Sequence, residues 1–318
     1  MSPEEAAPIH RKLFTEFCRI EMDAGGPDPQ VKLTAEAIKA HPIGGPELAG
    51  LFVVPYTCAG AALLWRLWER KPDPMSWGPW LEQHGKGLPI RKERRPVKGS
   101  WPRFMTCASG WLRWCEGRYE EMKDRSYAEV LKSVTDEVPY FGRYATMKLL
   151  ETMYQADLMS SPQNTIVPRD AKFPRRSMAL MMPEHEHLLT DKKLLTDRNA
   201  SRDVDELAER IRQGIIMRLE VPVSWFQIET MFCIYGQTLR GKYAAGRHDS
   251  ELGHWGKAIG HYGLEGGDAM QEQFDFYGLR SRLYPHQYLG ERGDPSWWGV
   301  RPELEEQQME VVRALGLA

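Results

Sequence analysis

Apolar residues recur along most of this chain with the spacing of α-helices. Alternation with a period of two, which is typical of strands, is almost absent. The chain is therefore expected to be mainly α, with a multi-helical fold. The helices are predicted over residues 3–24, 29–40, 47–69, 77–83, 104–117, 126–137, 143–158, 203–219, 223–240, 269–280 and 303–315.

A helical hairpin is predicted within residues 133–158. Pro139 ends the first helix, because the residue before a proline avoids the helical conformation. Gly142 permits a tight turn or a close approach of the backbone, and a second helix begins near Arg143. Free N–H groups at that helix start, together with Arg143 and Lys148, could hold a phosphate. The alternative is a plain helical hairpin with its charges facing water.

Two irregular segments rich in basic residues are predicted on either side of this hairpin. Residues 84–103 hold seven basic residues and one acidic residue, interrupted by proline and glycine and ending near Trp101. Residues 159–176 have a similar character. Such segments suit an extended polyanion, and a solvated run of charge is the alternative. The candidate cations are Arg94, Arg95, Lys98, Arg169, Lys172 and Arg175.

Composition limits the class of protein. The net charge of −2 over 318 residues excludes a uniformly basic nucleic-acid binder but allows a local basic patch. No apolar run is long enough to span a membrane. Five cysteines without a CxxC pair, and no secretory signal, indicate free thiols in a reducing cytoplasm. We expect one domain over 1–318, or a subdivision into 1–125 and 126–318.

Candidate proton chemistry lies on the helix at 223–240. Glu229 and Cys233 are four residues apart and therefore share a helix face. Burial would raise the pKa of Glu229 and suit it as a general base, and Cys233 is a second candidate as a nucleophile. The alternative is a core cysteine beside a partly exposed glutamate. The run 184–187 contains metal-ligating residue types without a third ligand at a recognisable spacing, so no metal site is predicted.

Two groups of motifs resemble known families. Val138-Pro-Tyr-Phe-Gly142 with its flanking helices resembles the helix-hairpin-helix element of DNA glycosylase-fold proteins, although only the proline and the last glycine of the usual hairpin are present. A second resemblance combines this hairpin with Ile228-Glu-Thr-Met-Phe-Cys233 and the later motifs Gly241-Lys-Tyr and Gly246-Arg-His-Asp. In these motifs the chain resembles the alpha-glutamyl/putrescinyl thymine pyrophosphorylases. These amino acid:DNA transferases hypermodify bacteriophage DNA. The resemblance covers residues 50–250 as separate motifs.

The resemblance implies a DNA glycosylase-like helical fold with long basic loops and a specific reaction. An amino acid such as glycine, or a polyamine, displaces pyrophosphate from 5-(pyrophosphoryloxymethyl)uracil in DNA. The protein would be phage-encoded and act in the cytoplasm of a bacterial host. No cofactor is required by this chemistry, and it stays open whether a divalent metal assists. The alternatives are a helical DNA-binding protein and a glycosylase-like repair enzyme.

The resemblance also gives the candidate residues their roles. Glu229 or Asp170 would accept the proton of the amine, with Cys233 as a further catalytic candidate. Aromatic rings would stack on DNA bases or fill the gap left by an extruded base; these are Tyr144, Tyr140 and Trp101. Cations would hold the pyrophosphate; these are Arg143, Lys148, Arg169, Lys172 and Arg175.

Overall fold

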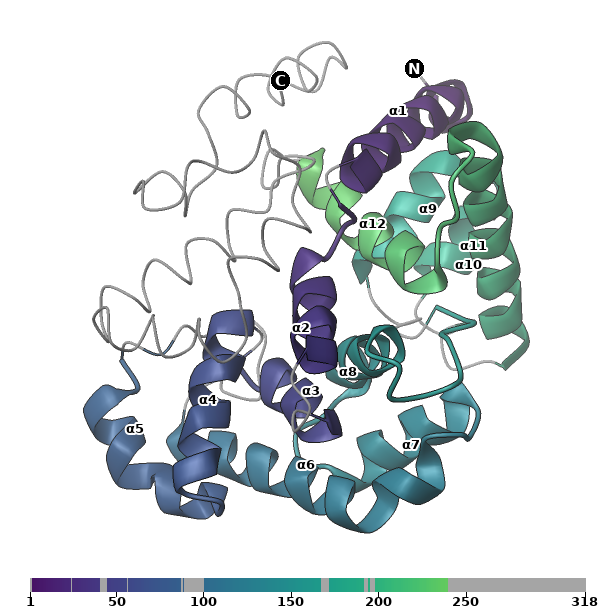
Figure 1. The fold of residues 1–318 in the computed structure, drawn as a ribbon. Helices are drawn as coiled ribbons and strands as arrows, with labels where there is room; N and C mark the ends of the chain where they lie inside the picture. Colours follow the sequence, from purple (N-terminus) through teal and green to yellow (C-terminus); the bar gives the residue numbers. More distant parts are fainter. Residues whose placement is uncertain are drawn as a thin grey trace, which may run out of the picture. The chain divides into compact units, whose positions relative to one another are not determined.

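The computed structural model confirms the mainly α fold class (Figure 1). It describes residues 2–23, 25–40, 45–55, 57–86, 88, 100–166, 172–191, 194 and 198–239. These residues form twelve α-helices, a few 3-10 turns and no strand. None of the described helices is long and apolar enough to cross a membrane.

The described residues fall into two compact units. The first, named the α1 unit, contains residues before Pro29 and from Gln163 onward. Its helices are α1 (Pro3–Asp23), α9 (Lys172–Met181), the 3-10 helix Pro183–His185, α10 (Glu186–Thr190), α11 (Arg198–Leu219) and α12 (Trp225–Thr238). Within this unit, α1 packs against α9, α11 and α12 although far from them in sequence (Figure 1).

The second unit, named the α6 unit, spans Pro29–Pro162 in the described chain. Its helices are α2 (Pro29–Ala40), α3 (Gly45–Val53), α4 (Cys58–Arg70), η1 (Pro74–Trp77), α5 (Gly78–His84), α6 (Trp101–Met122), α7 (Tyr127–Glu137) and α8 (Arg143–Gln155). Along the sequence, the described chain passes from one unit to the other at Pro29 and at Gln163, because α1 packs with the later helices, and residue 125 lies within the α6 unit.

The predictions for α1, α2, α7 and α8 are confirmed to within a few residues. The single helix expected at 47–69 is wrong, because the chain forms α3 and α4 with Pro55 between them. The Thr57 hydroxyl starts α4 anew by accepting a hydrogen bond from the Gly60 N–H at 3.0 Å.

Three other helix starts differ from the sequence predictions. The helix α6 begins at Trp101, capped by Ser100, so Trp101 does not end a loop. The helix α11 begins at Arg198, before the start predicted at residue 203. The helix α12 begins at Trp225 after a capping box between Ser224 and Gln227. The helices expected at 269–280 and 303–315, and the basic stretch 89–99, lie outside the described residues.

Trp111 of α6 is the centre of packing in the α6 unit. Its ring stacks on Trp114 at 5.0 Å and on Phe141 at 6.1 Å between centroids. Its indole N–H donates to the Pro46 carbonyl at 3.0 Å, so the buried polar atom is satisfied. Gly50 of α3 makes room for this ring, since a Cβ there would lie 1.9 Å from the Trp111 Nε1. One tryptophan thereby joins α3, α6 and the α7–α8 hairpin.

This packing gives a test of the α6 unit. Gly50→Ala should lower the free energy of unfolding by about 3 kcal/mol, because the new methyl group overpacks the site against Trp111. Gly117→Ala on α6 is the control, since nothing lies within 4 Å of its added Cβ. It should raise the free energy of unfolding by about 0.5–1 kcal/mol through helix propensity. Equal urea midpoints for the two variants would contradict the packing described.

Candidate functional site

The α1 unit contains a pocket of about 980 Å³, lined from α1, α9, α10 and α12. Most of its wall is apolar, with contributions from Ala6, Leu180 and Leu189. Basic side chains from one helix, α9, occupy another part of the wall. A concave, mainly apolar site with a few polar groups on one side is typical of small-molecule and nucleotide pockets.

The basic wall consists of Lys172, Arg175 and Arg176, all within the first half of α9. The prediction of an irregular segment through residue 176 is wrong here, because α9 begins at Lys172. Lys172 and Arg176 are exposed, whereas Arg175 is only 4% exposed. A guanidinium stays charged at any physiological pH, and its planar N–H groups match a phosphate or carboxylate in bidentate fashion. The helix therefore brings together two of the predicted cations, Lys172 and Arg175.

Small residues let α9 and α12 approach closely beside this pocket. Ser177 is fully buried, and its hydroxyl donates to the Phe232 carbonyl at 2.7 Å. Across from it, a Cβ added to Gly236 would lie 3.2 Å from the Ser177 Oγ. Gly236 itself lines the pocket next to Ser177. The contact fixes the rotation of α9 and hence the direction in which Arg175 projects.

His10 of α1 lines the same pocket and was not a candidate in the sequence. Its Nδ1 lies 3.2 Å from the Tyr235 hydroxyl, which is buried in an aromatic cluster with Phe14 and Phe17. Burial lowers the pKa of His10 from its ordinary value of 6.5, so the ring is neutral near pH 7. The available signal was a histidine four residues before Phe14, on the apolar face of the first helix.

Glu229 occupies a different part of the α1 unit. It is fully buried, and its Oε2 accepts a hydrogen bond from the Gln163 side-chain amide at 2.8 Å. It does not line the pocket, and Cys233, which is partly exposed, does not line it either. A general base must reach the proton it removes. The expected role of Glu229 as a base therefore does not fit its position, and the glutamate instead joins α12 to the segment that follows Pro162.

The hairpin between α7 and α8 is anchored by buried residues and by contact with α6, and one of its aromatic rings is exposed to solvent. Val138 and Phe141 are buried, and a Cβ on Gly110 would lie 2.4 Å from Pro139 Cδ. Tyr140, between them, is 52% exposed and has a φ of 66°. The guanidinium carbon of Arg103 lies 5.6 Å from its ring centroid. A non-glycine residue in the left-handed region is strained, and such strain concentrates at functional sites.

Gly142 has a different role from the one expected. Its φ of −79° is open to any residue, so the left-handed position of the hairpin is Tyr140 and not Gly142. Gly142 is the N-cap of α8, offers no side chain to the first N–H groups, and has nothing within 4 Å of an added Cβ. Arg143, the first residue of α8, is exposed. This helix start is accessible to an anion.

Three other predicted site residues, two in the hairpin and one at the start of α6, contribute to packing. Lys148 is fully buried, with its Nζ 5.6 Å from the Tyr144 ring centroid, so a phosphate contact does not fit its position. Tyr144 is partly exposed and contacts that ammonium. Trp101 packs edge-on against Phe104 at 5.7 Å and against Gly85, where a Cβ would lie 2.2 Å from the ring. Of the predicted stacking residues, Tyr140 is the most exposed.

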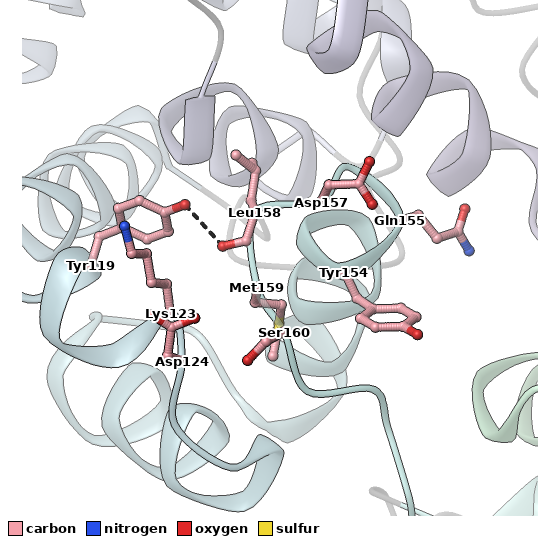
Figure 2. Close-up of a pocket in the computed structure, with 9 residues that line it drawn as sticks. All are labelled: Tyr119, Lys123, Asp124, Tyr154, Gln155, Asp157, Leu158, Met159 and Ser160. Carbon is pink, nitrogen blue, oxygen red and sulfur yellow. Dashed lines mark hydrogen bonds between the residues drawn. The ribbon is translucent and has the colours of Figure 1, made fainter.

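A second pocket, of about 640 Å³, lies where α6 and α8 end in the α6 unit (Figure 2). The Tyr119 hydroxyl donates to the Leu158 carbonyl at 2.9 Å across it. Two of its three charged side chains form ion pairs: Lys123 contacts Glu120 at 2.7 Å, and Asp157 contacts Lys39 at 3.1 Å. The third, Asp124, is a carboxylate, which repels an anion. The α1-unit pocket, with its basic wall, is therefore the better candidate for an anion.

The other predicted site residues lie outside the part of the chain that the structure describes. They are Asp170, Arg169, Arg94, Arg95 and Lys98. Within the described part, no group of three histidine, cysteine, aspartate or glutamate side chains is arranged to hold a metal ion. No protein-family model, curated protein or solved structure matches this chain.

The strain at Tyr140 yields a test. Tyr140→Gly removes the left-handed strain and the contact with Arg103, so the free energy of unfolding should be unchanged or up to about 1 kcal/mol higher. Its affinity for duplex DNA with a mismatched pair should fall by about 10-fold, because an aromatic platform is lost. Tyr154→Ala, which removes another exposed tyrosine of the α6 unit, is the control for affinity. Lower stability with unchanged affinity would show that Tyr140 is merely structural.

Proposed function

We propose that the protein is a DNA-modifying transferase. In the proposed reaction the amine of an amino acid, such as glycine, or of a polyamine displaces pyrophosphate from 5-(pyrophosphoryloxymethyl)uracil in DNA. The reaction takes place in the cytoplasm of a phage-infected bacterium. The observation that carries the proposal is the pocket of the α1 unit, where Arg175 and two exposed cations face an apolar wall.

The basic wall suits the leaving group of this reaction. As the carbon–oxygen bond of the base breaks, negative charge gathers on the departing pyrophosphate. Cations fixed in place before the reaction stabilise that charge without reorganising, and they do so best where water is excluded. Arg175 is nearly buried, so its charge acts through protein rather than solvent. Lys172 and Arg176 sit at the exposed part of the same wall, where the outer phosphate would lie.

The apolar wall suits the base. A uracil ring is planar and needs apolar surface on its faces once it has left the DNA stack. The pocket volume of about 980 Å³ accommodates a nucleotide together with an amino acid. Among the described lining residues, Glu186 of α10 is the one carboxylate, and it would attract the ammonium form of the donor. The site thus has cations for the pyrophosphate, an apolar wall for the base and a carboxylate for the amine donor.

The α6 unit supplies features that support DNA binding. Tyr140 is an exposed aromatic ring next to an accessible helix start, and Arg103 and Arg143 are exposed cations on the two helices beside it. Proteins that bind nucleic acid combine such cations for the phosphates with aromatic rings for unstacked bases. These features carry no sequence readout, which fits an enzyme that finds its target by a chemical mark on the base.

The test is a transfer assay with matched variants. DNA containing the pyrophosphorylated base is incubated with the protein and glycine or putrescine, and digested nucleosides are analysed by mass spectrometry. The wild type should give an aminomethyl-linked nucleoside and one pyrophosphate per product. Arg175→Lys keeps the charge but loses the bidentate geometry, so kcat/KM should fall by about 10²-fold. Arg210→Ala, an exposed arginine of α11, should stay within about two-fold.

Because Arg175 is buried, its substitution can lower activity simply by destabilising the fold. A second variant, of exposed residues only, controls for this effect. Lys172→Ala with Arg176→Ala removes two exposed cations of the same wall and should lower kcat/KM by about 10-fold with unchanged thermal stability. A free base and an abasic site would instead identify a glycosylase-like enzyme. DNA binding without any new nucleoside or pyrophosphate would identify a binding protein, and either result would refute the transferase.

A further inference from the structure

The proposed transfer needs a proton acceptor that lies in the pocket and is held in one orientation, and His10 meets both conditions. It lines the pocket that contains the basic wall, and it is the only one of the described histidines that does so. It also has a fixed partner, since its Nδ1 lies 3.2 Å from the Tyr235 hydroxyl. A base in a pocket that is oriented by a third group is the arrangement found in many proton-transferring sites.

The hydrogen bonds around Tyr235 determine which ring nitrogen can accept a proton. The Tyr235 hydroxyl also contacts the backbone carbonyl of His10 at 3.4 Å, and a carbonyl can only accept. The single hydroxyl proton therefore goes to that carbonyl, and the contact with the ring is made by Nδ1–H donating to the hydroxyl oxygen. Burial raises the pKa of Tyr235, which keeps the hydroxyl protonated. In this tautomer the lone pair lies on Nε2, and no described residue hydrogen-bonds that atom.

The charges on the elements around His10 favour its neutral form before the reaction. Lys172, Arg175 and Arg176 of α9 share the pocket with it, Glu186 of α10 is the described carboxylate, and Tyr235 of α12 is neutral. The net charge of these groups is positive, and three nearby cations oppose a fourth. When pyrophosphate departs into this wall, its negative charge reverses the balance. A proton on His10 is then favourable.

We propose that Nε2 of His10 accepts the proton released by the amine in the transfer step. This inference rests on the proposed function. The amine enters in its neutral form, having lost one proton to solvent. Its nitrogen lone pair forms the carbon–nitrogen bond while the carbon–oxygen electron pair leaves with pyrophosphate. The resulting secondary ammonium gives one proton to Nε2, and the imidazolium formed faces the departing anion. Tyr235 acts through His10 as a positioning residue.

The tautomer can be tested without any activity. Nitrogen-15 NMR of the full chain with labelled histidine distinguishes Nδ1–H from Nε2–H in the neutral ring, and His10→Gln assigns the signal. The expected result is the Nδ1–H form, which Tyr235→Phe should shift toward a mixture. Addition of inorganic pyrophosphate should raise the pH at which the His10 signal titrates. An Nε2–H tautomer in the wild type would overturn the inference and leave the proposed function standing.

The kinetic test separates the proton acceptor from the amine. The donor must itself be neutral, which gives log kcat/KM a slope of about one with pH in every variant. The wild-type slope should steepen to about two below the pKa of His10, and that of His10→Gln should not. His10→Gln should also be slower by about 10²-fold. His187→Gln, an exposed histidine that does not line the pocket, should match the wild type.

The outcomes distinguish the two proposals. If wild type and His10→Gln transfer the amine at equal rates with the same slope, His10 is not the proton acceptor and the transferase remains. If Tyr235→Phe lowers the rate and loses the steeper slope while its thermal stability is unchanged, the positioning role holds. If it keeps both the wild-type rate and the wild-type slope, Tyr235 does not position His10. If the wild type forms no aminomethyl nucleoside, the proposed function fails and the inference fails with it.

Discussion

The close approach of α9 to α12 is the constraint on which the candidate site depends. Ser177 and Gly236 are small enough to let the two helices meet, and the hydroxyl of Ser177 donates to the α12 backbone at Phe232. Such a contact fixes the rotation of a helix about its own axis, because the side chains point in set directions from the backbone. With Ser177 turned inward, Arg175 projects into the pocket wall and is almost fully buried there. Burying a guanidinium costs desolvation free energy, so the surrounding structure must stabilise Arg175 in this position.

In the α6 unit, too, small residues allow close packing that positions a side chain, here an exposed aromatic ring instead of a buried cation. Trp111 fills the space that Gly50 leaves and stacks on Phe141, so the base of the hairpin is a closely packed core. Gly110 likewise leaves room for Pro139. Because both ends of the hairpin are anchored, Tyr140 can be kept in the left-handed region with its ring in solvent. The strain is local, and packing in the core sustains it.

Periodicity and capping residues were sufficient to predict the helical class and most helices of the described chain. The start of α9 was missed because Pro174 indicates a loop, yet proline is tolerated in the first turn, where its missing N–H has no partner to lose. Periodicity could place Glu229 and Cys233 on one face but could not show that Glu229 is fully buried while Cys233 is only partly buried. The role of His10 depends on Tyr235, 225 residues away, and local patterns contain no information about such a contact.

Binding of the pyrophosphate leaving group to the basic wall of the α1-unit pocket can be observed in a crystal structure with inorganic pyrophosphate. We expect pyrophosphate density within hydrogen-bond distance of the Arg175 guanidinium, with Lys172 or Arg176 at the outer phosphate, and loss of that density in Arg175→Ala. Pyrophosphate bound at the start of α8 beside Gly142, with none in the pocket, would contradict it.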